Sequence, residues 1–391
     1  MMAQLRRFSQ AITIDSKDKL LRASFEKLND TPVESEIEVT QEEESVTTEK
    51  ELRPHRSTKP FRPIILCILF ILSWNFTAAY GQISGSITTT AEFSDNVFQL
   101  SAYDFDRYDH NHPYLAYVTT TDDVTMGTNI NLAYPMHYKW WLIEPSIDAN
   151  LSHNLSNSEK YRRDVSTRLK IKRYKWDASL RYAYAPHIYV RDYKDSDGTH
   201  ALEDYSYERN QYRADLNIRP LKKGTALFTV RYEELYYNQY WKEYDGNSLT
   251  YGIGWNQDLP VFSLRGMYYY RVFDNDVIDD DSSYESNKYD IGMKLQRMPL
   301  SDLDPNGITW RPALSLSYEE RFYQGLDSWY GGRIDMITTT NAGIDVFISD
   351  SWKFMLDYSH IFRNVDSPNS SVLRLKEYSE NRLGAAVEYQ F

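Results

Sequence analysis

The sequence predicts an all-β protein, a closed antiparallel transmembrane β-barrel of about 14 strands, with 12 to 16 also compatible with the pattern. Three observations predict it. From Gln82 onward apolar and polar residues alternate in one segment after another, which is the period of a strand with one apolar and one polar face. The connections between these segments are alternately short and long. The aromatic residues, which include 33 Tyr and 9 Trp, gather near segment ends, as in the interfacial girdles of membrane barrels.

Residues 52–81 have the anatomy of a secretory signal peptide. Four Arg and Lys residues over 53–62 precede an apolar core, PIILCILFILSW (63–74), and small residues precede a cleavage site near Gly81-Gln82. The core is shorter than the roughly 20 residues that a transmembrane helix needs, so a retained anchor is the weaker alternative.

Residues 1–51 are polar and acidic, as in VESEIEVTQEEESVTTEKE, and this composition predicts disorder. They are either a cytoplasmic extension or the result of a start site placed too early. Cys67 is the only cysteine and lies in the signal core, so cleavage would leave no thiol in residues 82–391. The formal net charge of −12 argues against a nucleic-acid partner.

The alternation from Gln82 to the end divides into 14 predicted strands, an even number that places both barrel ends of the chain on one side. These are 83–93, 113–134, 140–152, 161–172, 176–190, 206–219, 225–240, 247–256, 261–273, 286–297, 307–322, 332–348, 352–364 and 378–391. The segment 113–134 is interpreted as one long strand because its outward parity continues from Tyr114 to Tyr134, although two strands joined at TTDD are an alternative.

The connections alternate in length along the chain. The short ones are RYK (173–175), PLKKG (220–224), QDLP (257–260) and SDS (349–351), and the long polar ones are 94–112, 191–205, 274–285 and 365–377. Short turns at one end and long loops at the other are typical of barrels in the outer membrane. An open sheet would expose unpaired amides to lipid, and closure removes that edge.

The chain ends in NRLGAAVEYQF, where Leu383, Ala385, Val387, Tyr389 and Phe391 share one face. In this it resembles the Gram-negative outer-membrane β-barrel proteins, whose last strand ends in alternating apolar residues and a terminal Phe. The segment FSDNVFQLS (93–101) is similar to openings of porins of the exopolysaccharide-linked type. The resemblance implies that this ending is read by the barrel-assembly machinery, and that outer-membrane lipid and lipopolysaccharide surround the folded chain. It implies no oligomeric state.

The residues at the polar positions of the strands are expected to line the interior. They are Arg168, Lys170, Lys172, Arg181, Arg213, Asp215, Arg219, Arg231, Glu233, Arg265, Arg271, Lys294 and Arg311. A wall with this many charges must be wet, internally paired, or both, because unpaired ions are costly to bury dry.

Two functions are compatible with this wall. The first is a porin-like channel for passive diffusion of small hydrophilic solutes, with a basic bias that favours anionic or sugar-like ones. The second is a closed barrel in which salt bridges fill the lumen, for example between Arg213 and Asp177 or Glu233, and the outer loops bind polysaccharide, lipopolysaccharide or a partner protein. The aromatic segment EELYYNQYWKEYDG (233–246) would suit contact with a sugar, although an interfacial girdle explains it equally well.

Metal, cofactor and catalytic sites have little support. The acidic loop DNDVIDDDSSYE (274–285) is a weak metal candidate through Asp274, Asp276, Asp279, Asp280, Asp281 and Glu285. It lacks the oxygen ligand and the glycine that a calcium-binding helix-hand loop has at its fifth and sixth positions. No G-x-S-x-G motif accompanies the scattered histidines, so the sequence predicts neither an enzyme nor a cofactor.

Overall fold

The computed structural model describes residues 82–195, 198–275, 282–301 and 307–391. The predictions for residues 1–51 and for the signal peptide at 52–81, including the cleavage site and Cys67, lie outside the described residues. The following description concerns the barrel alone.

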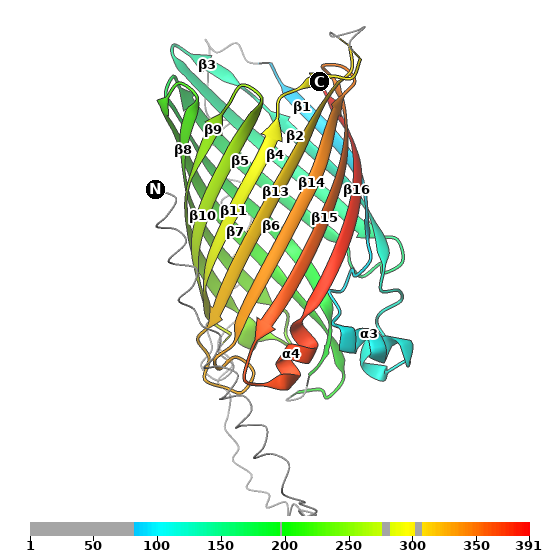
Figure 1. Cartoon of the computed structure of the whole chain (residues 1–391). Helices are drawn as coiled ribbons and strands as arrows, with labels where there is room; N and C mark the ends of the chain where they lie inside the picture. The colour runs from blue at the N-terminus through cyan, green and yellow to red at the C-terminus, as the bar shows by residue number, and fades with distance from the viewer. Residues whose placement is uncertain (1–81, 196–197, 276–281, 302–306) are drawn as a thin grey trace, which may run out of the picture. The chain divides into compact units, whose positions relative to one another are not determined.

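Fourteen antiparallel strands form one closed barrel, which confirms the predicted fold class and strand number (Figure 1). The strands are β1 (Ser84–Ser94), β2 (Asp123–Ala133), β4 (Trp141–Asn154), β5 (Arg162–Arg173), β6 (Trp176–Lys194), β7 (Leu202–Leu221), β8 (Gly224–Tyr237), β9 (Gly246–Asp258), β10 (Phe262–Asn275), β11 (Tyr284–Leu295), β13 (Thr309–Tyr323), β14 (Ile334–Phe347), β15 (Trp352–Asp366) and β16 (Tyr378–Gln390). Two short strands, β3 (Met136–Tyr138) and β12 (Met298–Pro299), pair with β4 and β13 respectively at one rim.

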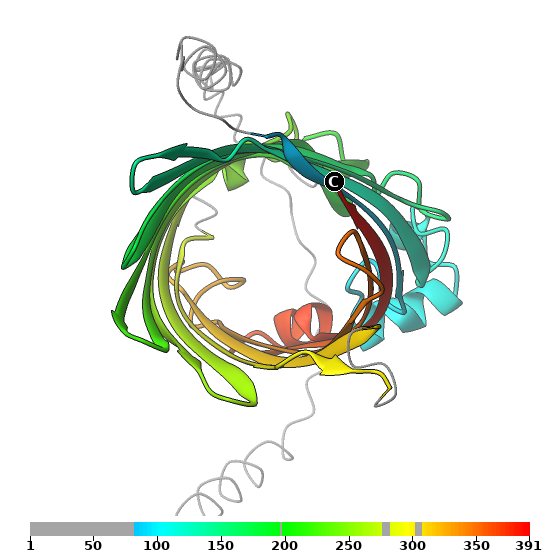
Figure 2. The same ribbon diagram turned by 90° about the horizontal axis from the view of Figure 1, so that it is seen from above.

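Closure is made where the first strand meets the last. Strand β1 pairs with β2 along one edge and with β16 along the other, from Ser86 opposite Gln390 to Ser94 opposite Arg382. Strands β11 and β13 pair directly as well, so the ring is continuous. Figure 2 shows this ring end-on. Within the described strands, each therefore has a neighbour on both sides, and the barrel has no free edge.

The two faces of the sheet differ in chemistry because the side chains of each strand alternate between them. Large apolar residues of one parity are exposed on strand after strand, as at Val230, Ile253 and Leu316. In a closed barrel this face is the outer one, and its contiguous apolar surface is what a bilayer requires. Charged residues away from the strand ends, such as Arg213 and Asp290, occupy the opposite parity and therefore face the interior.

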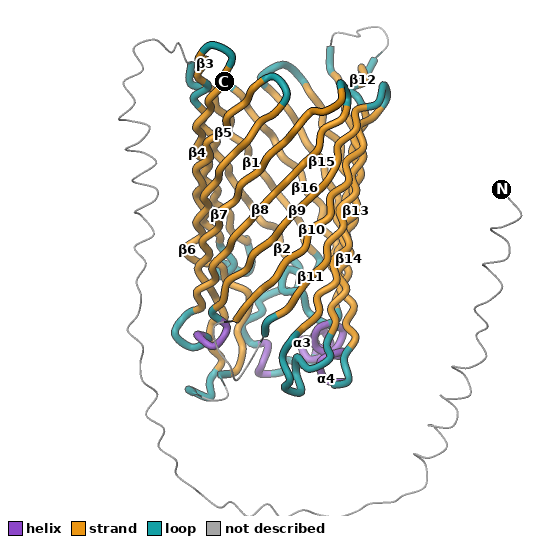
Figure 3. The backbone as a smooth tube through the Cα atoms, turned by 90° about the vertical axis from the view of Figure 1, so that its left-hand side faces the viewer, coloured by secondary structure: helices purple, strands orange, loops and turns teal. Residues whose placement is uncertain are grey.

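The connections differ between the two ends, as the sequence predicts. The turns at residues 174–175, 222–223, 259–261 and 348–351 are short and lie at the end that carries Phe391 (Figures 1 and 3). The long loops lie at the other end, together with the helices α3 (Ala102–Asp109) and α4 (Ser370–Lys376) and the short turns of helix η1 (Pro113–Leu115) and η2 (Lys242–Tyr244). By analogy with outer-membrane barrels, we call the first end periplasmic and the second extracellular.

The prediction of a single strand over 113–134 is wrong. Strand β2 begins at Asp123, and residues 113–115 form η1 instead. Leu115 and Val118 are buried with Phe98 and Leu100 in a small core that belongs to the loop. The two buried positions of this segment are three residues apart, and Tyr114 and Ala116 are exposed, so burial in the loop does not follow the alternation that predicted a strand.

The polar segment 191–205 is also mostly strand, because β6 continues to Lys194 and β7 begins at Leu202. At 19 and 20 residues these strands are longer than the 9–11 residues of a tilted membrane crossing, so their ends project beyond the bilayer. The edge-on contact of the Tyr193 and Tyr205 rings, 5.2 Å between centroids, stabilises the projecting ladder.

Among the described residues, no helix has the length and the apolar run needed to cross a membrane.

The C-terminal residue completes the seam at the periplasmic end. Phe391 N donates to Gly85 O at 3.0 Å, and Gly85 N donates to Phe391 O at 2.9 Å. A Cβ atom at Gly85 would lie 2.7 Å from Cζ of Phe391 and 2.8 Å from the carbonyl oxygen of Asn131. Glycine is therefore required here so that the terminal ring can lie across the first strand.

We predict that Gly85→Val weakens barrel closure, because overpacking of this kind costs about 1–3 kcal/mol and the clash includes a backbone atom that cannot move away. The measurement is the heat-modifiable shift of the refolded chain in gel electrophoresis, with its urea midpoint. Gly266→Val is the matched control, since it also adds a side chain to a strand glycine, and a Cβ atom there meets nothing within 4 Å. Equal midpoints for the two variants would contradict the assigned role of Gly85.

Candidate functional site

The candidate site is the inner wall of the barrel, where charged side chains of the strands lie together. The predicted residues Arg168, Arg181, Arg213, Arg231 and Arg271 are brought into one line by the strand register. Direct cross-strand partners run in the order Arg168, Arg181, Arg213, Arg231, Thr250, Arg271, Ser286 and Arg321. We call this line of eight paired positions the arginine row.

The arginine row crosses the wall obliquely. It follows the hydrogen-bonding direction, and the strands of a closed barrel are tilted by about 35–45°, so the row climbs as it passes around the ring. Arg168 lies in the half of β5 nearer the periplasmic turn. Arg321 lies two positions before the extracellular end of β13. The row therefore follows a spiral from about the middle of the wall to its extracellular end.

Carboxylates beside the row balance part of its charge. Arg213 Nε is 2.8 Å from Asp215, Arg321 Nε is 2.8 Å from Glu319, and Arg168 is 4.0 Å from Glu144. Glu233 is shared, at 3.8 Å from Arg231 and 3.3 Å from Arg271. Four carboxylates thus pair with five of the six arginines, and the row keeps a net positive charge.

The remaining predicted wall residues fall into two groups. Within the described part of the chain, no carboxylate lies within ion-pair distance of Arg181, Lys170, Lys172, Arg265 or Lys294. Arg219 and Arg311, by contrast, are paired. Arg219 lies 2.5 Å from Asp177, and Arg311 lies 2.6 Å from Asp345, both towards the periplasmic end. The predicted pairing of Arg213 with Asp177 or Glu233 does not occur, since Arg213 pairs with Asp215 on its own strand.

A cavity of about 230 Å³ lies on the arginine row. Arg213, Arg231, Thr250 and Arg271 from the row line it, together with Lys288 and other residues. Sequence reasoning missed Thr250, Ser286 and Lys288 as members of this site. Their strands were assigned, but only the register between strands shows that these side chains stand beside the arginines.

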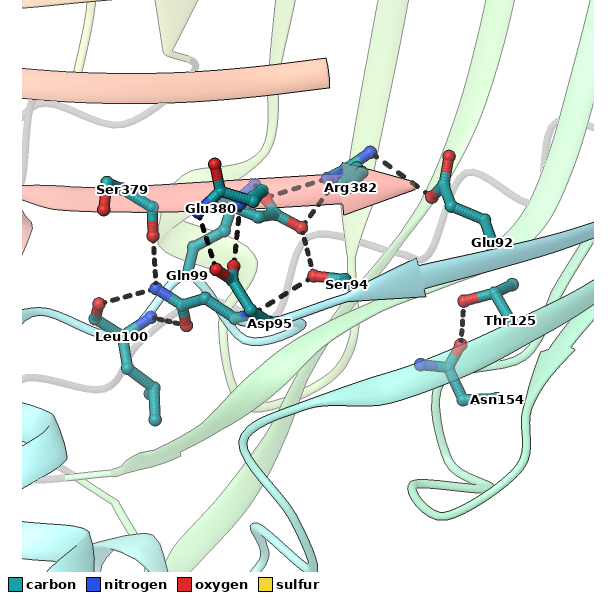
Figure 4. A network of polar contacts seen from close by, with 12 residues as sticks. Glu92, Ser94, Asp95, Gln99, Leu100, Thr125, Asn154, Ser379, Glu380 and Arg382 are labelled. Carbon is teal, nitrogen blue, oxygen red and sulfur yellow. Dashed lines mark hydrogen bonds and ion pairs between the residues drawn. The ribbon is translucent and has the colours of Figure 1, made fainter. Parts of the chain in front are cut away.

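A second polar cluster joins the two strands of the seam near its extracellular end (Figure 4). Glu380 on β16 is only 1% exposed and accepts hydrogen bonds from Ser94 Oγ at 2.7 Å and from Arg382 Nε at 2.7 Å. Asp95 accepts from the backbone N and from Nδ2 of Asn381, both at 2.7 Å. Side-chain bonds therefore hold the seam at this end, as the Gly85 and Phe391 backbone bonds hold it at the other.

At the extracellular mouth, segments from different parts of the ring contact one another. Lys376 of α4 donates from Nζ to the hydroxyl of Tyr193 at 3.5 Å and lies 5.4 Å from the ring of Trp329. These three residues come from α4, β6 and the loop between β13 and β14. Figure 2 shows α4 within the outline of the ring. The mouth is therefore narrower than the barrel beneath it.

The aromatic segment 233–246 packs against neighbouring rings at the mouth. Trp241 is 6% exposed, and its ring lies 5.5 Å from that of Tyr205 and 6.4 Å from that of Tyr244. These ring faces are occupied by one another, which leaves little of Trp241 for a sugar to stack on.

The predicted assembly signal forms part of the outer surface. Leu383, Val387, Tyr389 and Phe391 are exposed on the lipid-facing parity of β16, and the ring of Tyr389 lies 4.8 Å from that of Trp352. Recognition of this ending by an assembly machinery stays a prediction.

The weak metal candidate lies largely outside the described residues, which include only Asp274, Asn275 and 282–285 of that loop. Among the described residues, no group of three or more His, Cys, Asp or Glu side chains has the arrangement of a metal site. Two of the scattered histidines have local partners: His187 stacks on Tyr161, and His110 Nδ1 lies 2.7 Å from the carbonyl oxygen of Asp106.

Solved structures similar to this barrel include outer-membrane porins and channels. An anion-selective porin from Comamonas acidovorans is 9% identical, with a TM-score of 0.40 over 80% of this chain and 100% of that one. The channel DcaP of Acinetobacter baumannii is 12% identical, with a TM-score of 0.44 over 80% and 97%. OprD of Pseudomonas aeruginosa is 10% identical, with a TM-score of 0.37 over 80% and 97%. Neither a family model nor a curated protein matches the chain.

At such identities and TM-scores, these similarities say nothing about solute or mechanism. The fold assignment comes from the closed strand pairing of this chain itself, and its apolar exterior and short periplasmic turns are those of an outer-membrane barrel.

We predict that Glu380→Gln loosens the extracellular end of the seam. The change removes the buried negative charge that Arg382 contacts through Nε and Nη2, at a cost of roughly 1–3 kcal/mol. The urea midpoint of the detergent-folded barrel and hydrogen exchange in residues 92–96 measure it. Glu159→Gln in an exposed loop is the control, and exchange that is equally fast in both variants would refute the seam contact.

Lys160, in the loop between β4 and β5, provides a pH-dependent prediction. Burial, together with the nearby charge of Arg191, lowers the pKa of Lys160 to about 8. Because a free lysine titrates near 10.5, the unfolded chain binds more protons than the folded one between these values. The free energy of unfolding should therefore rise with pH across that window, by on the order of 1–3 kcal/mol.

The check is denaturant unfolding from pH 7.5 to 9.5, where tyrosine ionisation is common to the wild type and the variant, with a smaller rise expected for Lys160→Met. Lys242→Met, in another extracellular loop where the lysine is exposed, should keep the wild-type slope. If Lys160→Met also keeps the wild-type slope, the assigned burial of Lys160 is wrong.

Proposed function

We propose that this protein is an outer-membrane channel for passive diffusion of small hydrophilic solutes, and that anions pass more readily than cations. The observation that carries the proposal is the arginine row. Like charges directly opposite one another on neighbouring strands destabilise a sheet. This chain places Arg168, Arg181, Arg213 and Arg231 opposite one another on four successive strands. The arginine row costs stability and extends along the depth of the barrel. We therefore expect that it serves transport.

The size of the barrel supports a wet interior. An eight-stranded barrel is just filled by its own side chains, whereas barrels of 16 to 18 strands enclose an aqueous channel. Fourteen strands lie nearer to the second case. Two cavities of about 470 and 510 Å³ also lie along the inner wall. Arg265 lines both and Lys294 lines the first, and neither residue has an ion-pair partner among the described residues.

The arginine row supplies the preference for anions. Its cations exceed its carboxylates, and water in the lumen keeps them hydrated, so the wall attracts mobile anions without holding them permanently. The covered mouth would limit the size of the solute. Outer-membrane lipid and lipopolysaccharide are the surroundings that this proposal implies, and the barrel-assembly machinery is the partner implied for biogenesis.

A second candidate function is a surface-binding barrel that engages polysaccharide, lipopolysaccharide or a protein. A cavity of about 260 Å³ at the mouth favours it. Tyr117, Tyr193 and Trp329 line this cavity beside Arg107 and Lys376, and aromatic faces beside cations suit an acidic saccharide.

For the channel, we predict anion-selective conductance of the purified barrel in planar bilayers. Arg168→Glu and Arg181→Glu should lower the anion-to-cation permeability ratio, by about twofold to fivefold each, because a reversed charge beside an aqueous path changes the ion energy by up to about 1 kcal/mol. The reversal potential in a salt gradient gives the ratio directly.

Lys222→Glu in an exposed periplasmic turn is the matched control, since it makes the same charge change away from the row, and its ratio should stay near that of the wild type. Zero current from a folded, heat-modifiable barrel would refute the channel and favour the surface-binding function. Conductance with no effect of either arginine variant would refute the role of the row.

A further inference from the structure

One cavity on the arginine row has the composition of a binding site. Its volume is about 230 Å³, and four cationic side chains line it, those of Arg213, Arg231, Arg271 and Lys288. The carboxylates among its lining residues are Asp290 and Glu319. The lining comes from β7, β8, β9, β10, β11 and β13, so the site exists only when these strands are in register.

Four hydrogen-bonding groups at this cavity are buried and have no hydrogen-bond partner in the described structure. Three of them are donors, Thr250 Oγ1, Arg231 Nε and Arg271 Nε, and the fourth is the acceptor Asp290 Oδ1. Thr250 is 1% exposed and stands directly between the two arginines in the pairing register. Buried donors without acceptors cost free energy, so their clustering at one cavity indicates that a ligand rich in acceptors completes it.

The carboxylates nearby do not satisfy this need. Glu233 is shared between Arg231 and Arg271, and it also accepts from Gln211 Nε2 at 2.6 Å. Lys288 Nζ lies 3.6 Å from Asp290, which is beyond hydrogen-bond distance. The two central arginines therefore hold one negative charge between them, and an additional anion would lie among an excess of cations.

We propose that this cavity is a saturable binding site for a small oxyanion, a phosphate or carboxylate group that Arg231, Arg271 and Lys288 hold and that the hydroxyl of Thr250 orients. Planar guanidinium groups match the oxygens of carboxylate and phosphate in pairs. The volume equals that of about seven to eight waters, which accommodates an oxyanion with a small organic body. The proposal deepens the channel function, because the ligand would reach the site through the lumen.

The experiment measures equilibrium binding, which does not depend on conduction. The mature barrel, folded in detergent micelles in buffer without phosphate, is titrated calorimetrically with inorganic phosphate and, separately, with succinate. An uncharged sugar serves as the ligand control. We expect saturable binding of at least one anion with a stoichiometry near one, and affinity that weakens as salt increases.

The variants locate the site. Arg271→Gln and Lys288→Gln should each weaken anion binding about tenfold, because each removes a charge-assisted contact. Thr250→Val keeps the shape and all charges, so a loss of several-fold affinity there assigns the hydroxyl. Lys294→Gln is the matched control for Lys288→Gln, since it removes the same charge from the same face of β11 outside the cavity, and it should bind like the wild type. Heat modifiability shows that each variant is folded.

The outcomes separate the two proposals. Absence of saturable binding, or equal weakening by Lys288→Gln and Lys294→Gln, overturns the site and leaves the channel standing on its conductance. Saturable binding lost in Arg271→Gln and Thr250→Val supports the site even if the barrel conducts no current, in which case only the channel falls.

Discussion

The structure depends on one constraint: a sheet in lipid must leave no backbone amide unpaired. This chain meets it by pairing β1 with β16 over nine residues, from Ser86 to Ser94. The two ends of that seam are secured by different chemistry. At the periplasmic end the backbone of Phe391 bonds with that of Gly85, and at the extracellular end Glu380 bonds with the side chains of Ser94 and Arg382. Closure also fixes which side chains of each strand face outwards and which face the interior, because a closed sheet has one outer and one inner face.

Parity in turn concentrates charge inside the barrel. Lipid excludes ions from the outer face, so the charged residues of 14 strands line one interior. Near the periplasmic rim Arg219 is paired with Asp177 and Arg311 with Asp345, whereas Lys170, Lys172, Arg265 and Lys294 have no carboxylate within ion-pair distance among the described residues. Along the arginine row Arg231 and Arg271 share one carboxylate, and neighbouring strands present arginines to one another. The wall therefore combines paired charges, which stabilise the barrel, with charges that are available to a solute.

The extracellular end adds a second level of organisation. The loop after β1 has its own small core around Phe98 and Leu100, and Arg191 from β6 donates to the carbonyl oxygens of Phe98 and Gln99. Helix α4 is attached to β6 through Lys376 and Tyr193. Any solute that enters from outside would pass these contacts before it meets the arginine row, so the mouth and the wall act in series.

The sequence by itself determined the fold class and the 14 strands, because both follow from local alternation and from the lengths of the connections. It also indicated that Arg168, Arg181, Arg213, Arg231 and Arg271 share one face. It did not distinguish a lipid-facing strand from a packed loop at 113–122, where Leu115 and Val118, three residues apart, are buried within the loop. Only the tertiary structure aligned the arginines into a row and placed Thr250 among them, because the register between strands far apart in sequence is set by closure of the whole ring and leaves no mark within any single strand.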